Sequence, residues 1–542
     1  MKIDNIKKRI LPLLSVLFFL SAMYSCDDNF MDKQPLDVIS EEDVWNDINL
    51  SETFINQIYA SMRTGIDYSP RLNIISDEAY GRGRDYVHLI NRGELTPSNN
   101  TGCDYWEHYY DIITACNIFL EKAKGNEALA GDKLNRMIGE IKFFRGYCYF
   151  RLTAFYGGVP LITKTFSLND DYLLARNNYE ECINFAIAEL DEAASLLPLS
   201  YTGDDLGRVT KGAALAIKAR ALLYAASPLN NTNNDKSKWQ KASDAAKAVI
   251  DLNLYSLYPD YKQLFLEPFN EEIIWCRPFN NEVKVERQIE LWYYPNGSGG
   301  YGQIFPIQNV VDAYETLNGK LPADDPAYDP QNPYVNRDPR FYASILYDGA
   351  PWQDREIETF LPGGKDSNEG NEGWNATYSG YYPRKFIDES IIKPTSTNVG
   401  STDWIFCRYG EILLNYAEAQ FYLGNEDMAR EYLNMVRSRP SVQMPPVTES
   451  GEELEKRIQN ERRVELFFEE HRFFDVRRWK IAMVTENEDA VKVEIIKDLA
   501  TGKKTYTYKP FEARAFFEQH YLIPIPQSEI DKNSKLEQNP GY

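Results

Sequence analysis

Aromatic side chains gathered in one irregular part of the chain could bind a sugar by stacking on it. Trp292, Tyr293 and Tyr294 are consecutive and precede a glycine-rich stretch, and Trp352 follows in the same region. A sugar ring has an apolar face of C–H groups that an aromatic ring can cover, and tyrosine is ordered at small entropic cost because it has two χ angles. The rings could instead brace a loop. Because packing all three neighbours inward is difficult, we expect at least one to face solvent.

The segment 281–400, which contains these rings, is predicted to be a folded, loop-rich insertion. It holds 12 Gly, 11 Pro and 18 aromatic residues, with little helical periodicity. Disordered segments are poor in aromatic residues, so a long irregular segment of this composition is more consistent with a functional one. If the first set of rings faces inward, the next candidates for a stacking surface are Trp374, Tyr378 and Tyr381.

No motif for nucleotide or metal binding lies in a suitable context. The glycines of 297–302 have the spacing G-x-G-x-x-G, but Pro295 and Pro306 exclude the strand and long helix that such a loop requires. The acidic, proline-rich loop at 324–338 could offer oxygen ligands to Ca²⁺, yet it lacks EF-hand spacing, so a solvated turn is expected. Since the chain has only four histidines and His471 is expected in the core, we predict no metal or other cofactor.

The charge of the chain excludes a further class of function. It contains 59 Lys and Arg against 81 Asp and Glu, which gives a net charge of −22. Phosphate contacts need clustered basic residues, so binding of nucleic acid is not predicted. The same abundance of carboxylates makes acidic pairs uninformative about glycoside hydrolysis, which uses two of them.

The N-terminus has the features of a secretory signal that ends at a lipid-modified cysteine. Lys2, Lys7, Lys8 and Arg9 precede an apolar stretch that is too short for a stable membrane-spanning helix. Cys26 stands where a bacterial lipobox places its acylated cysteine, and an acidic pair follows it. Removal of residues 1–25 would leave Cys26 as the first residue of the mature chain. The alternative is a plain secretory signal with an incidental cysteine.

The six other cysteines are scattered and form no CxxC pair. Several lie within helical apolar patterns, where a buried thiol behaves as a small hydrophobic group. An exported chain can form disulfides, but this spacing gives no framework, so mostly free thiols are expected. The six are Cys103, Cys116, Cys148, Cys182, Cys276 and Cys407.

Helical periods dominate the rest of the chain. Apolar residues recur every three or four positions in 178–197, which begins with a capping-box pattern at Asn178 and Glu181. An alanine-rich helix is expected from Thr210 to Pro228, where small residues allow neighbouring helices to approach closely. The segment 411–439 predicts two helices joined by a turn at Gly424, in the order of a tetratricopeptide repeat.

These features divide the chain into three parts. Residues 1–25 form the signal peptide, 26–230 an N-terminal helical region, and 231–542 a C-terminal region that includes the insertion 281–400. No strict 34-residue period is present, so the helix pairs are degenerate and separated by insertions. A stacked helix-pair scaffold of this kind leaves its loops available for recognition.

Several long motifs also occur in one order along nearly the whole chain. After Cys26 they are DEAY (77–80), W-x3-Y-x2-I from Trp106, IKFFRGYCYFRLTAFYGGVPL (141–161), TKGAALAIKARALLYAASP (210–228), NRDPRFYASI (336–345), RYGEILLNYAEAQ (408–420), NERRVELFFEEHRFFDVRRW (460–479) and LIPIPQSEIDKNSKLEQNPGY (522–542). In this order they resemble the SusD/RagB family of outer-membrane lipoproteins, the glycan-binding partners of TonB-dependent transporters.

The resemblance implies a mostly α-helical fold: a tetratricopeptide-like helix-pair superhelix with a loop-rich ligand-binding insertion. It implies no catalytic activity, a lipid-anchored position on the outer membrane and a SusC-like TonB-dependent transporter as partner. The acidic pair after Cys26 resembles a signal for display on the outer surface, which predicts that the protein faces the exterior. It further implies that Asp77, Arg82 and Arg84 bond sugar hydroxyls. The implied stacking rings are Trp292, Tyr293, Tyr294 and, as a weaker member, Trp352.

Two alternatives to glycan capture remain open at this point. The same scaffold could bind peptides for import, in which case the site would offer unpaired strand-like backbone and few aromatic rings. A helical glycoside hydrolase is the second alternative, and release of reducing ends from a glycan would identify it.

Overall fold

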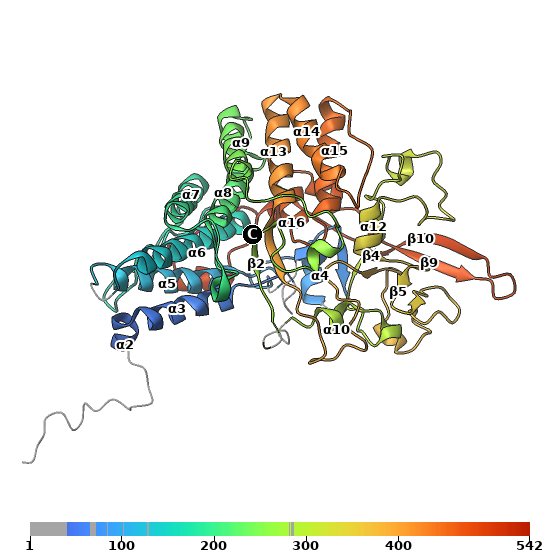
Figure 1. The fold of residues 1–542 in the computed structure, drawn as a ribbon, viewed down its shortest axis with the longest axis horizontal. Coiled ribbons are helices and arrows are strands. Elements are labelled where there is room, and N and C mark those ends of the chain that lie inside the picture. Colours follow the sequence, from blue (N-terminus) through green and yellow to red (C-terminus); the bar gives the residue numbers. More distant parts are fainter. Residues whose placement is uncertain are drawn as a thin grey trace, which may run out of the picture.

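The computed structural model describes residues 41–65, 72–83, 85–100, 102–126, 129–280, 282 and 287–542 (Figure 1). The predicted signal peptide, the predicted lipidation site Cys26 and the predicted ligand residue Arg84 lie outside the described residues. In the described part of the chain, no helix is both long and apolar enough to cross a membrane.

Helices that pack in chain order form the left and upper parts of the molecule in Figure 1. The helices of the N-terminal series are α2 (Glu41–Asn46), α3 (Ile48–Ser61), α5 (Trp106–Ala123), α6 (Asp132–Tyr156), α7 (Tyr179–Leu196), α8 (Lys211–Ala226) and α9 (Lys236–Ile250). The later series comprises α13 (Tyr409–Leu423), α14 (Glu426–Arg437) and α15 (Gly451–Glu465). Each helix from α5 to α9 packs on the next, and α13 packs on α9, α14 and α15. The predicted helix-pair superhelix is confirmed.

The ends of these helices follow local sequence signals. Asn178 caps α7 through a reciprocal pair of hydrogen bonds with Glu181, of 2.9 and 3.0 Å, as its capping-box pattern predicts. Thr210 accepts a hydrogen bond from the backbone of Ala213 at the start of α8. Gly424 ends α13 with φ +91°, a left-handed conformation that glycine adopts without steric cost.

The remaining part of the molecule is loop-rich and contains only short elements. Its strands pair two by two, all antiparallel: β1 (Ala79–Gly81) with β3 (Ile304–Pro306), β2 (Ile273–Arg277) with β8 (Trp404–Arg408), β4 (Ile345–Leu346) with β7 (Tyr382–Pro383), β5 (Pro351–Trp352) with β6 (Arg355–Glu356), and β9 (Ala490–Lys497) with β10 (Lys504–Glu512). The β9–β10 hairpin projects from this part of the molecule (Figure 1).

The described chain also contains several short helices. The α-helices are α4 (Asp85–Asn91), α10 (Ile289–Tyr293), α11 (Gln308–Val311), α12 (Pro339–Ser344), α16 (Arg472–Arg478), α17 (Ala482–Thr485) and α18 (Gln527–Lys532). The 3-10 helices are η1 (Leu72–Ile75), η2 (Gly203–Asp205), η3 (Gln263–Phe265), η5 (Asn296–Ser298), η6 (Pro322–Asp324), η7 (Gly373–Asn375) and η8 (Glu518–Tyr521).

A buried network of charged side chains joins the helices to the loop-rich part. Arg408, at the end of β8, bonds Glu272, Glu465 and Glu469 at 2.7 to 2.8 Å. Arg439 binds the first two of these carboxylates as well. All five side chains are buried, and removing one partner from such a network typically costs about 3–5 kcal/mol because it leaves an uncompensated charge. The network explains why the motifs at 408–420 and 460–479 are rich in Arg and Glu.

Two expectations about buried groups are confirmed. His471 is buried, and burial lowers its pKa to about 4, so the imidazole is neutral at pH 7. The six cysteines outside the signal region are buried free thiols.

The acidic loop at 324–338 is solvated only in part, contrary to the sequence-based expectation. Asp324 and Asp329 are exposed. Asp325 is buried and accepts hydrogen bonds from the side chains of Thr316 and Asn318, which precede this loop. Asp338 is buried as well, where it caps α12 and pairs with Arg340 at 2.8 Å. Half of these carboxylates therefore hold the fold together.

Candidate functional site

Three of the four predicted stacking rings are core residues. Tyr293, Tyr294 and Trp352 are 1%, 0% and 1% exposed. The Tyr294 hydroxyl donates to a backbone carbonyl, and the Trp352 indole donates to Ser298 at 3.0 Å. The rings of Tyr294 and Trp352 also contact each other edge to face, with centroids 4.8 Å apart. Prediction of these three rings as a sugar-stacking surface is therefore wrong, because each is satisfied inside the fold.

Trp292 behaves differently from its two neighbours. The short helix α10 turns the chain so that Trp292 stays half-buried while the next two rings face the core. Its ring contacts Tyr301 edge to face, with centroids 5.2 Å apart. The expectation that one ring of the three reaches solvent holds for this residue.

Asp77 is a structural residue in the fold. Its carboxylate is buried and accepts two hydrogen bonds of 2.8 Å from Arg472. Arg463 forms a further ion pair with it at 2.8 Å. Burial alone would raise the pKa of Asp77, but the two guanidinium charges outweigh it and hold the pKa well below its usual range. The prediction that Asp77 contacts sugar is not supported, since no part of the carboxylate is left for a ligand.

Arg82 lies at the surface and is fixed in position. Its Nη2 donates to the backbone oxygen of Tyr301 at 2.6 Å and to Oδ1 of Asn375 at 2.8 Å. The guanidinium carbon lies 5.9 Å from the ring centroid of Trp374, which is within the range of a cation–π contact. Arg82 therefore remains a candidate ligand residue.

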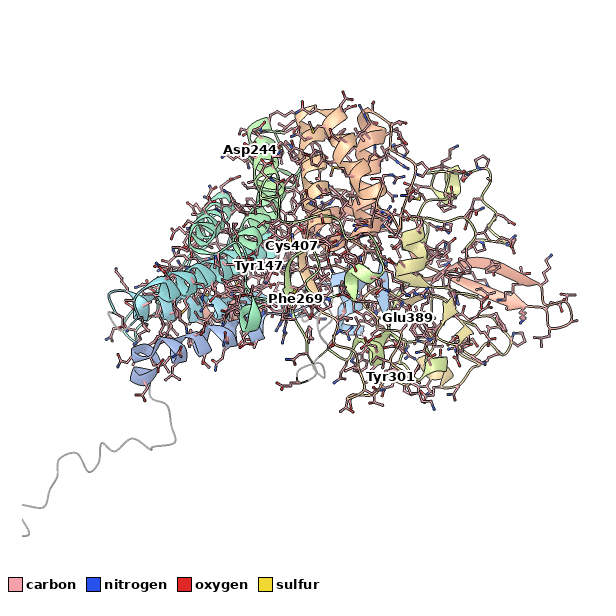
Figure 2. The ribbon with its side chains drawn as sticks, viewed as in Figure 1. Tyr147, Asp244, Phe269, Tyr301, Glu389 and Cys407 are labelled. Atoms are coloured by element: carbon pink, nitrogen blue, oxygen red, sulfur yellow. The ribbon has the colours of Figure 1, made fainter. Side chains whose placement is uncertain are left out.

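Around Arg82, aromatic rings form a surface that we call the aromatic face. Trp374 and Tyr378 are 73% and 49% exposed. Tyr301, labelled at the lower margin of the loop-rich part in Figure 2, lies 6.3 Å from Trp374 between centroids. The aromatic face consists of Arg82, Trp292, Tyr301, Trp374 and Tyr378. Tyr381, the third member of the second predicted set, is buried and does not belong to it.

Local backbone geometry brings these residues together from distant parts of the chain. The pairing of β1 with β3 places Arg82 beside Gln303, whose carbonyl accepts from the Arg82 backbone at 2.7 Å. Gly302 has φ +46°, and a Cβ there would lie 2.5 Å from the carbonyl oxygen of Asn375. Only glycine allows this close approach. It holds the 297–302 loop against η7, which presents Trp374.

The aromatic face has the chemistry of a sugar-binding surface. Exposed indole and phenol rings offer flat apolar area, and the fixed guanidinium beside them donates hydrogen bonds. In the described residues, no group of three His, Cys, Asp or Glu side chains could hold a metal ion.

A separate hollow lies on the helical body. It has a volume of about 1000 Å³ and is lined by residues of α5, the 160–174 loop and α18. Tyr172 at its edge is 68% exposed. Its rim carries the charged side chains Glu107, Asp111, Glu121, Lys122, Lys164, Glu529 and Lys532. A rim of mixed charges fits a sugar less well than exposed rings beside one fixed donor do.

Two members of the site were missed by the sequence analysis. Tyr301 lies in the glycine-rich stretch that was considered only as a nucleotide loop. Asn375 orients Arg82 and is almost fully buried. The signal that could have indicated both is the glycine at 302, since a loop glycine often marks a close backbone approach.

The chain matches two protein-family models and a related protein of known family. The model of the SusD family matches residues 271–542, and a model described as "Starch-binding associating with outer membrane" matches residues 29–223. SusD-like protein P38 of Formosa agariphila is 26% identical over 521 residues, which cover 88% of this chain and 92% of that protein.

Solved structures give the same result. A SusD-like protein from Bacteroides fragilis superposes with a TM-score of 0.81 at 29% identity, covering 94% of this chain and 100% of that one. A SusD-like carbohydrate-binding protein from the same species superposes with a TM-score of 0.79 at 26% identity, covering 91% and 99%. With its superhelical body, its loop-rich part and matches along both, this chain belongs to the SusD family.

Proposed function

We propose that the chain is a non-catalytic glycan-binding protein whose ligand stacks on the aromatic face. The observation that carries the proposal is the exposure of Trp374 beside the fixed guanidinium of Arg82. Exposure of an indole to water is unfavourable, and a bound sugar ring would cover it. The carbohydrate-binding structural relative supports the ligand class.

Within the proposal, each residue of the face has a distinct role. Trp374 and Tyr378 supply the stacking area. Tyr301 packs beside Trp374 and Trp292 packs on Tyr301, whereas Tyr378 packs on Phe305. Arg82 donates to sugar hydroxyls, and Asn375 keeps its guanidinium in place. Because Arg82 is held before the ligand arrives, little conformational entropy is lost on binding.

Replacing Trp374 with alanine should weaken glycan binding without weakening the fold. Loss of one ring contact should cost about 1–3 kcal/mol of binding free energy, or roughly five- to 150-fold in affinity. The melting temperature should stay unchanged, because the ring is mostly exposed. The measurement is calorimetric titration with the oligosaccharide selected by a glycan array, together with thermal melts.

A matched control is Tyr172→Ala, which removes a ring of similar exposure on the helical body. It should bind as the parent chain does. Unchanged affinity in Trp374→Ala, or loss only in Tyr172→Ala, would move the site away from the aromatic face. Binding of peptides but no glycan would favour the import of peptides, and release of reducing ends would favour a hydrolase.

We further propose that the protein is a lipid-anchored component of the outer membrane that delivers its glycan to a SusC-like TonB-dependent transporter. Support comes from the signal and lipobox pattern that ends at Cys26 and from the outer-membrane association in the family description. Two or more acyl chains give durable attachment, whereas one chain binds marginally.

Replacing Cys26 with alanine should release the protein from the outer membrane or block its maturation. Membrane fractionation of the producing cells measures the first result, and affinity purification from solubilised membranes should recover the transporter with the parent chain. Asp27→Asn, which changes the next residue, should leave the protein in the membrane fraction. A Cys26→Ala protein that stays in that fraction, or a parent chain that purifies alone beside its expressed transporter, contradicts the proposal.

A further inference from the structure

A second cleft lies apart from the aromatic face and shares no residue with it. Its volume is about 770 Å³, within the range of small-molecule sites. It is bounded by α11, the 321–330 loop, α15 and the base of the β9–β10 hairpin. The residues used in the argument are Asp312, Tyr328, Asn460, Arg463, Glu488 and Tyr508.

The walls of this cleft are aromatic and held in place. Tyr328 and Tyr508 line it from the loop and from the hairpin, and both are partly exposed. The Tyr508 hydroxyl donates to the backbone oxygen of Pro330 at 3.2 Å. Gln331 bonds both backbone groups of Tyr506, at 3.0 and 3.1 Å. Since loop and hairpin are fastened together, the opening is formed before a ligand arrives.

The floor presents a braced carboxylate. Asp312 is exposed, and its Oδ1 accepts a hydrogen bond of 2.7 Å from Gln308. Gln308 is buried and is itself fixed by the hydroxyl of buried Tyr381 at 2.6 Å. In the described part of the chain no hydrogen bond reaches Oδ2 of Asp312. One acceptor oxygen is thus held in position and remains available.

Two further polar groups line the same cleft. Asn460 donates through Nδ2 to the backbone of Ala313 at 2.9 Å, which fixes the amide. Arg463 is oriented by Asp77, with an ion pair of 2.8 Å. The cleft therefore combines a carboxylate, an amide and a guanidinium with two phenol rings. Adjacent acceptors and donors beside aromatic walls suit the hydroxyl groups of a sugar.

Charge selects the kind of sugar. The cleft is lined by three carboxylates, of Asp312, Asp325 and Glu488, and by one guanidinium, that of Arg463, which is paired with Asp77. Neither Asp312 nor Glu488 forms an ion pair in the described residues. An anionic glycan would be repelled by these carboxylates. We propose that this cleft is a second saccharide-binding site of the chain, and that it takes a neutral oligosaccharide.

The test uses the full mature chain with Trp374→Ala, so that binding at the aromatic face is weakened. Calorimetric titrations use maltohexaose, cellohexaose, laminarihexaose, xylohexaose and mannohexaose, with trigalacturonic acid as the anionic probe. Two variants are added separately to this background: Asp312→Asn, which removes the charge, and Tyr508→Ser, which removes one wall. Asp324→Asn serves as the control, since Asp324 belongs to the 321–330 loop and is exposed but does not itself line the cleft.

At least one neutral hexaose should bind the Trp374→Ala chain, and each cleft variant should weaken that binding tenfold or more. Asp324→Asn should leave it unchanged, and trigalacturonic acid should not bind. Thermal melts test whether each variant is folded. If Tyr508→Ser is not folded, Asp312→Asn alone decides the outcome. The proposal is overturned if no neutral hexaose binds, if binding survives both cleft changes, or if only the anionic probe binds. The cleft variants change no residue of the aromatic face, so a loss of binding in them reports on the second cleft alone.

Discussion

Replacing Asp77 with asparagine should lower the free energy of unfolding by about 3–5 kcal/mol at pH 7. The substitution keeps the size of the side chain but leaves Arg472 and Arg463 without their buried counter-charge. Because folding depresses the pKa of Asp77, its contribution is complete above the unfolded-state pKa and is lost as pH falls through the folded-state value. Urea unfolding of both proteins, followed by circular dichroism, measures the difference.

The control is Asp171→Asn, which removes the exposed partner of Lys535. Exposed ion pairs contribute little, so the urea midpoint of this variant should equal that of the parent chain. If Asp77→Asn shows the parent midpoint while its glycan affinity falls, Asp77 would be a ligand residue after all, as the family resemblance implies.

Replacing the neighbouring Glu78 with glutamine should remove a large part of the loss of stability at high pH. Both carboxyl oxygens of Glu78 are buried without a hydrogen-bond partner in the described residues. Burial, with the charge of Asp77 added, raises its pKa to about 8 from 4.5, so the folded state keeps a proton that the unfolded chain releases. The contribution of Glu78 is complete below pH 4.5 and is lost as pH rises through about 8.

The expected size of this effect follows from the shift in pKa. Each unit by which the pKa of Glu78 is raised corresponds to about 1.4 kcal/mol. The free energy of unfolding of Glu78→Gln should therefore rise relative to that of the parent chain by up to about 5 kcal/mol between pH 4.5 and pH 8. Urea midpoints at both pH values measure it. Glu452→Gln, on the exposed side of α15, should give a profile parallel to that of the parent. A parallel profile for Glu78→Gln would show that Glu78 is ionised in the fold.

The helices could be predicted because their signals are local. The capping pair at 178 and 181, the alanine-rich run of α8 and the turn glycine at 424 each specify structure within a few residues. The buried charge network could not be predicted, because Arg408 and Glu272 meet only after β2 and β8 have paired. The spacing of these two residues along the chain does not indicate that they are in contact.

The candidate site was predicted only in part for the same reason. The run at 292–294 indicated rings near the surface, but which of them face inward depends on distant partners such as Trp352 and Phe468. The second predicted set was Trp374, Tyr378 and Tyr381, of which the first two are exposed and Tyr381 is buried. The family resemblance implies that Asp77 binds the ligand, whereas its role in the fold depends on Arg463 and Arg472, almost 400 residues away.

The structure of a complex with the oligosaccharide selected by the array tests the central claim most directly. We expect a sugar ring in contact with the Trp374 indole, at about 4.0–4.5 Å between heavy atoms, and one of its hydroxyl groups within hydrogen-bond distance of Arg82. Occupancy of the second cleft in the same crystal would not affect this result. A bound sugar that contacts neither Trp374 nor Arg82, with the aromatic face empty, would contradict the account.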